Sequence, residues 1–127
     1  MQEKHLYEYA VIRLVPKVER EEFLNVGIIL FSKKEKFLKA VFNLDEERLR
    51  IFCKDMDRDE ICSNLDSFKK ICEGNKNGGP IAQLDLPSRF RWLTAARSSI
   101  IQTSRPHPGM TNDLDVTLKR LFKELVL

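Results

Sequence analysis

Two apolar segments near the N-terminus constrain the fold more than any other feature of this sequence. In residues 6–15 apolar side chains fall on both alternating faces, with Leu6, Ala10, Ile12 and Leu14 on one and Tyr7, Tyr9, Val11 and Val15 on the other. This pattern predicts a strand that is covered on both sides. Pro16 ends it, because proline lacks the amide that a ladder needs. A second apolar run at residues 26–31 predicts a central strand.

The next residues change from strand spacing to helical spacing. Residues 32–36 form a polar turn, and residues 37–42 predict a third, antiparallel strand. Asn43, with Glu46 three residues later, resembles a helix cap. Apolar stripes then predict two helices within residues 44–74, the second beginning near Asp57 or Asp59 and ending at Gly74.

The last third of the chain predicts a more irregular arrangement. We expect a short helix over 86–93 with Pro87 in its first turn, and a fourth strand over 99–103. The two prolines within residues 105–112 predict a stiff turn. A final helix over 113–126 follows, capped by Thr111 or Asp113. The expected fold is α+β: one domain over 1–127, with an antiparallel sheet of three to four strands and helices packed on one face.

Composition limits which cellular compartment and which class of protein we expect. The 127 residues carry a net charge of +3, which is too small to make nucleic-acid binding the first expectation. The chain has no apolar segment of membrane-spanning length, so we expect no membrane association. Cys53, Cys62 and Cys72 have no CxxC spacing and predict buried thiols in a reducing cytoplasm. No metal-ligand spacing and no cofactor motif is visible, so neither group is expected.

The positive charge is concentrated in one segment. Residues 80–112 contain four arginines and a single aspartate, whereas the residues before and after them are neutral. Arginine forks bind phosphate and carboxylate oxygens, and hydroxyl groups complete such sites. The residues of this candidate binding site are Arg89, Arg91, Arg97, Ser98, Ser99, Arg105 and His107.

Each of these residues also has a structural interpretation. Arg89 and Arg91 are also compatible with positions on a solvent-exposed helix face. Arg97 or Arg105 is also compatible with an ion pair to the acidic residues within 45–60. His107 lies between two prolines, and this position is compatible with a structural role in a turn as well as with a role as an acid or base. The sequence contains no GxGxxG, GxxxxGK[ST], HExxH or GxSxG motif, so catalytic residues stay unknown and enzyme activity stays open.

Four strings in this chain resemble a bacterial family known as domain of unknown function 3037 (DUF3037). They are YAVIRLVP at 9–16, EFLNVGIILF at 22–31, RFRWLTAARSS at 89–99 and QTSRPHPG at 102–109. The chain departs from the family pattern at Ala96, where the family has proline. The resemblance implies a small cytoplasmic protein. Family members are often encoded beside kinase-like proteins related to the HipA toxins, which implies a kinase-like protein as the partner.

Two hypotheses from different classes follow. The first is a non-enzymatic protein-interaction or regulatory module, whose partner faces the arginine-rich segment and the Pro-His-Pro-Gly turn. The alternative is a binder of a phosphate-bearing ligand or nucleic acid that uses the arginines of residues 89–105. A less favoured variant of the alternative is a hydrolase that uses His107 on such a ligand.

Overall fold

The structure, a computed structural model, describes residues 4–95 and 99–127 of the chain. It contains five strands and four α-helices, joined in part by short 3-10 turns. The strands are β1 (His5–Leu14), β2 (Leu24–Ser32), β3 (Phe37–Phe42), β4 (Ile101–Thr103) and β5 (His107–Thr111). The helices are α1 (Glu46–Phe52), α2 (Arg58–Glu73), α3 (Leu86–Thr94) and α4 (Leu114–Leu125). The α+β class predicted from the sequence is confirmed.

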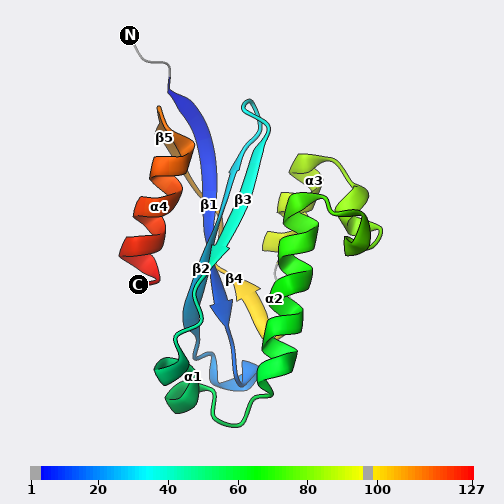
Figure 1. The fold of residues 1–127 in the computed structure, drawn as a ribbon. Coiled ribbons are helices and arrows are strands. Elements are labelled where there is room, and N and C mark those ends of the chain that lie inside the picture. The colour runs from blue at the N-terminus through cyan, green and yellow to red at the C-terminus, as the bar shows by residue number, and fades with distance from the viewer. Residues whose placement is uncertain (1–3, 96–98) are drawn as a thin grey trace.

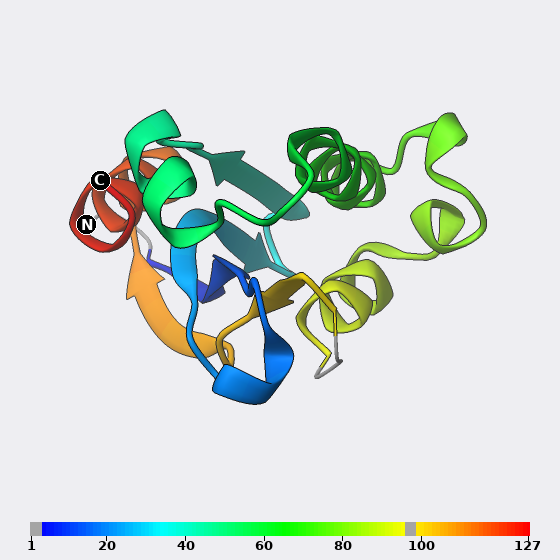
Figure 2. The same cartoon turned by 90° about the horizontal axis from the view of Figure 1, so that it is seen from below.

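All strand pairs in the sheet are antiparallel. β2 lies between β3 and β1, and the other side of β1 pairs with β4 and then with β5. Seen from below, the sheet runs from β3 at one edge to β4 and β5 at the other (Figure 2). The sheet thus has two edges, β3 on one side and the β4–β5 segment on the other.

Helices cover both faces of the sheet, and the expectation of helices on one face was wrong. Figure 1 shows α4 on one side of the sheet and α2 with α3 on the other. Ile12 and Ile29 belong to the core under α2 and α3, whereas Val11 and Ile28 belong to the core under α4. The two apolar faces of residues 6–15 required this arrangement, because each face needs its own cover.

A fifth strand, β5, occupies residues for which the sequence predicted a stiff turn. The amide of Ser104 donates to the Val11 carbonyl at 2.8 Å, so the odd-numbered residues of β1 bond toward β4 and β5. His107 and Gly109 pair with Tyr9 and Tyr7, which leaves the nitrogen of Pro108 pointing away from the sheet. The proline therefore removes no ladder hydrogen bond, which is why an edge strand tolerates it.

Aspartates cap the four helices. Asp45 accepts from two amides at the start of α1, although the sequence predicted Asn43 as the cap. Asn43 still extends the β2–β3 ladder, with its amide donating to the Val26 carbonyl at 2.7 Å, so the helix begins only after Asp45. The predicted caps Asp57 of α2 and Asp113 of α4 are confirmed, as are the left-handed Gly74 after α2 and Pro87 in the first turn of α3.

Two glycines allow close approach inside the sheet. A Cβ on Gly27 would lie 2.4 Å from the Val41 carbonyl oxygen, and a Cβ on Gly109 would lie 2.4 Å from the Tyr7 ring. β2 can therefore approach β3, and the Tyr7 ring can lie across β5, only because these positions have no side chain.

Candidate functional site

A cleft lies at the end of the sheet, between the β1–β2 connection and the corner where α1 leads into α2. Its volume is about 510 Å³. The β1–β2 connection, which includes a 3-10 turn at Val18–Arg20, forms one wall, and residues 51–56 form the other. The lining residues are Pro16, Lys17, Arg20, Glu22, Ile51, Phe52, Cys53, Lys54, Asp55 and Met56.

The cleft combines an apolar floor with a charged rim. Phe52 and Met56 are half-buried members of the main core, and Cys53 is buried beside them. Ile51 is 76% exposed, which is the largest value among the exposed apolar side chains of the described residues. Lys17 and Lys54 stand exposed at the rim. Such a surface suits a ligand that has both an apolar group and a charged or polar group.

Local backbone structure shapes both walls. Pro16 follows the end of β1, and Glu21 adopts a left-handed conformation with a φ of 56° before the chain enters β2. On the opposite wall, the Cys53 amide donates to the Leu49 carbonyl at 2.8 Å, and the Met56 amide donates to the Cys53 carbonyl at 3.0 Å. A non-glycine residue at positive φ is strained, and such strain often occurs at binding sites.

A second, smaller cleft continues from the first along the start of α2. Its volume is about 240 Å³, and it shares Cys53, Lys54 and Met56 with the larger cleft. Arg58 in its lining donates a hydrogen bond to Glu46 across the gap between α2 and α1. Together the two clefts are lined by five basic and three acidic side chains, so their net charge is +2.

Cys53 contributes packing to this site, because its environment keeps the thiol protonated. Burial raises the pKa of Cys53 above its usual value. A thiolate is the reactive form of cysteine. The group therefore acts as a small apolar part of the cleft floor at neutral pH.

Arg89, one of the predicted site residues, binds the protein itself. Its Nη1 donates to the carbonyl oxygens of Ile71 at 3.2 Å and Cys72 at 3.0 Å, at the C-terminal end of α2. A cation at this end of a helix stabilises it through the helix dipole. The Nη1 group of Arg89 is thus already engaged. Burial of the neighbouring Cys72 thiol raises its pKa to about 12, although the positive charge of Arg89 opposes this rise.

The other predicted site residues are dispersed. Arg91 is exposed on α3, and the half-buried Ser99 donates to the Ile101 carbonyl just before β4. Arg105 is exposed between β4 and β5. His107 is exposed on β5, with its ring centroid 5.3 Å from that of Tyr9. Arg97 and Ser98 lie outside the described residues. The structure therefore places Arg105 and His107 at the β4–β5 edge and Arg89 on the α2 and α3 side.

The described residues contain neither a metal-ligand set nor a helix that could span a membrane. No three His, Cys, Asp or Glu side chains of residues 4–95 and 99–127 lie together as a metal ligand set requires. None of the helices in this part of the chain is long and apolar enough to cross a lipid bilayer.

The sequence did not point to the cleft at the end of the sheet. Residues 17–22 looked like a charged connection, and the acids of residues 45–60 looked like helix starts. The two walls of the cleft are distant in sequence, and they meet only because α1 packs against the end of the sheet. Sequence patterns therefore do not reveal the cleft. The apolar Ile51 between two cations, Arg50 and Lys54, is the one local signal of an exposed apolar side chain on a charged surface.

Comparison with known proteins gives a single family assignment. The model of a family described as protein of unknown function (DUF3037) matches residues 9–126, nearly the whole chain. Neither the curated proteins nor the solved structures gave a significant match.

Proposed function

The chain belongs to the DUF3037 family, and from its geometry we propose that it is a non-enzymatic protein-interaction or regulatory module. The cleft at the end of the sheet is the proposed binding surface. The observation that supports it is the exposed Ile51 beside an apolar floor and a rim of charged side chains. Apolar anchors surrounded by polar groups are typical of the centre of protein interfaces. The kinase-like protein implied by the family resemblance is the first partner to test.

The phosphate-binding alternative receives less support from the positions of the arginines. Arg89 already donates to two carbonyl oxygens, so a phosphate would have to displace these bonds. Arg91 and Arg105 are exposed and remain available to a ligand, as does His107. A nucleic-acid complex would weaken steeply with added salt, which separates it from an interaction built on an apolar anchor.

We propose a cytoplasmic location for this activity. Cys53, Cys62 and Cys72 are all free thiols in the structure. Cys53 and Cys72 are buried as predicted, whereas the prediction of burial was wrong for Cys62, which is exposed. Free thiols of this kind persist in a reducing compartment.

The test is an interaction assay with variants that separate the surfaces. Tagged protein is purified with nuclease at moderate salt from its own organism, and its binding to the co-encoded kinase-like protein is measured by calorimetry. Ile51→Gln removes the apolar anchor and should weaken binding roughly tenfold or more, as expected for an interface anchor. Val116→Gln is the matched control, because Val116 is 60% exposed on α4 and does not belong to the cleft lining.

Each outcome of this assay decides between surfaces. Binding that is lost with Ile51→Gln and retained with Val116→Gln supports the cleft. Binding that is lost with Arg105→Ala and retained with Ile51→Gln would move the interface to the β4–β5 edge and contradict the proposed surface. Recovery of nucleic acid alone, released by salt, would contradict the interaction module.

A further inference from the structure

The ion pairs among the residues that line the two clefts leave an excess of positive charge. Glu22 is already paired with Arg20 in the lining of the first cleft. Glu46 of α1 is likewise paired with Arg58 of α2 in the lining of the second. Each pair cancels one positive and one negative charge, so the net charge of +2 belongs to the other charged side chains. These are Lys17, Arg50, Lys54 and Asp55.

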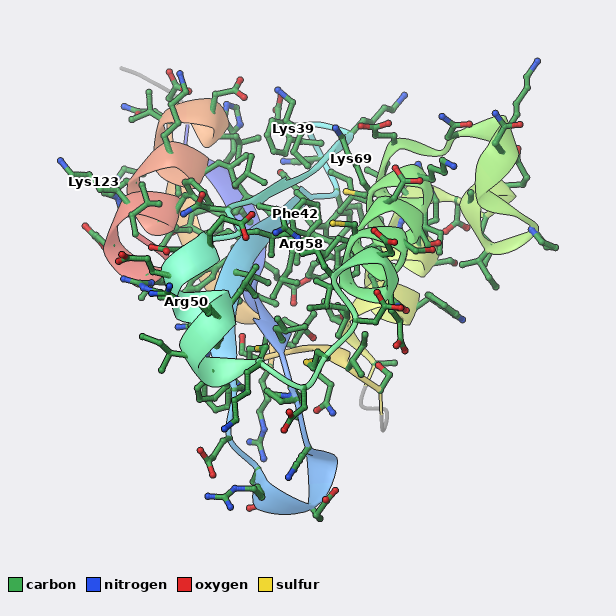
Figure 3. All side chains as sticks on the ribbon, turned by 60° about the horizontal axis from the view of Figure 1, so that its bottom comes forward. Lys39, Phe42, Arg50, Arg58, Lys69 and Lys123 are labelled. Carbon is green, nitrogen blue, oxygen red and sulfur yellow. The ribbon has the colours of Figure 1, made fainter. Side chains whose placement is uncertain are left out.

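The three basic side chains of this set have no carboxylate partner among the described residues. Lys17, Arg50 and Lys54 are exposed, and no ion pair within residues 4–95 and 99–127 includes them. Figure 3 shows Arg50 on α1 and the paired Arg58 at the start of α2. A carboxylate of a ligand can therefore bind the unpaired cations without displacing an acidic side chain of this part of the protein.

Lys54 connects the three unpaired cations. It lines both clefts, whereas Lys17 lines the first and Arg50 lines the second. Ile51, the exposed apolar anchor of the proposed function, lines the first cleft and lies between Arg50 and Lys54 in sequence. The apolar surface of the first cleft thus has an unpaired lysine on each wall, because Lys17 belongs to the β1–β2 connection.

This combination of charge and apolar surface restricts the occupant of the cleft. A second copy of the chain, bound through the same surface, would bring two net positive surfaces together, and these repel. A neutral or basic partner would cover the lysines without supplying carboxylates, at a cost in desolvation. A segment with both an apolar side chain and carboxylates complements the apolar floor and the unpaired cations together.

We propose that the cleft binds an acidic segment of a partner protein, in which an apolar side chain is flanked by aspartate or glutamate residues. The apolar side chain packs against Ile51 and the floor formed by Phe52 and Met56. The flanking carboxylates bind Lys17 on one wall and Lys54 on the other. These charges fix the orientation of the segment and speed its association. The inference rests on the proposed function, because it names the kind of partner segment that the same cleft binds.

Selection from a display library of short random peptides tests the inference. The full chain is the bait, and peptides that also bind the Ile51→Gln variant are removed. The remaining peptides should contain an apolar residue flanked by aspartate or glutamate. The most enriched peptide is then synthesised with a fluorescent label, and its Kd for the full chain is measured by anisotropy.

Charge reversal of the two lysines measures their contribution. Lys17→Glu combined with Lys54→Glu should weaken binding of the selected peptide roughly tenfold or more, because two attractive charges become repulsive. The matched control combines Lys33→Glu with Lys34→Glu, which makes the same change in net charge on the exposed β2–β3 turn, outside both cleft linings. It should leave the Kd within about twofold, because salt screens distant exposed charges. Thermal unfolding of both double variants verifies that they fold.

The possible outcomes separate this inference from the proposed function. Selected peptides that lack acidic residues, or a Kd that the reversal of Lys17 and Lys54 leaves unchanged, would overturn the inference and keep the cleft as the binding surface. A selection that yields no peptide dependent on Ile51 would contradict both. Binding of a labelled single-stranded oligonucleotide that the reversal abolishes and Ile51→Gln leaves unchanged would assign the cations to nucleic acid and overturn the inference.

Discussion

The β3 edge and the β5 edge of the sheet present different groups to solvent. On β5 the outward position 108 is a proline, so this edge lacks an amide at its centre. On β3 the Asn43 amide bonds to the Val26 carbonyl, and bonded and non-bonded pairs alternate along an antiparallel ladder. The outward positions are therefore Leu38, Ala40 and Phe42, and each keeps its amide. Proline on an edge strand is one way in which proteins prevent unwanted strand pairing. The chain has this protection at one edge and lacks it at the other.

The difference shows that edge protection can be local to a sheet. Lys39 gives β3 some protection, because a charge on an edge strand disfavours pairing with an apolar or basic strand. It does not disfavour an acidic one. A proline excludes every strand that needs the amide, whereas a lysine excludes strands by their charge.

The largest expected effect comes from proline placed at an inward position of β3. Lys39→Pro removes an amide that bonds to β2 and should lower the free energy of unfolding by about 2 kcal/mol or more. Ala40→Pro removes an outward amide and should cost within about 1 kcal/mol. Urea unfolding of both variants measures the difference.

Lys39→Ala is the control for the ion pair with Asp115, because it removes the charge and keeps the amide. It should unfold close to the wild type, since the pair is exposed. Equal destabilisation by the two proline variants would contradict the alternation of inward and outward amides on β3.

A smaller effect is expected at the other edge. Pro108→Ala restores an outward amide on β5 without changing the ladder to β1. The variant should lose about 0.5 kcal/mol, because the unfolded chain gains freedom when proline is removed. A loss of several kcal/mol in urea unfolding would show that the proline supports β5 in some other way.

Much of the fold followed from local patterns in the sequence. Apolar alternation and apolar stripes predicted β1, β2 and β3 and the helices α2 and α4, because burial sets these periods. Residues 107–111 were missed as a strand, because Pro106 and Pro108 carry strong turn signals. Those signals do not show that β5 pairs with β1, nor that in this pairing the nitrogen of Pro108 points away from β1.

The candidate site was less predictable than the fold. The arginines of residues 89–105 led to the prediction of a binding site in this segment. Arg89 instead donates to the carbonyls of Ile71 and Cys72, because α2 packs beside it. The cleft depends on residues 16–22 meeting residues 51–56, which are distant in sequence. The open β3 edge depends on the order of strands in the sheet, which local patterns do not give.

Hydrogen exchange of individual backbone amides, followed by NMR in the free protein, tests the open β3 edge most directly. Leu38, Ala40 and Phe42 should exchange rapidly, whereas Lys39 and Val41 should be protected by their bonds to β2. Gly109 on β5 should likewise be protected and Met110 should exchange rapidly. Uniform protection along β3 would show that its outer edge is covered and would contradict the account.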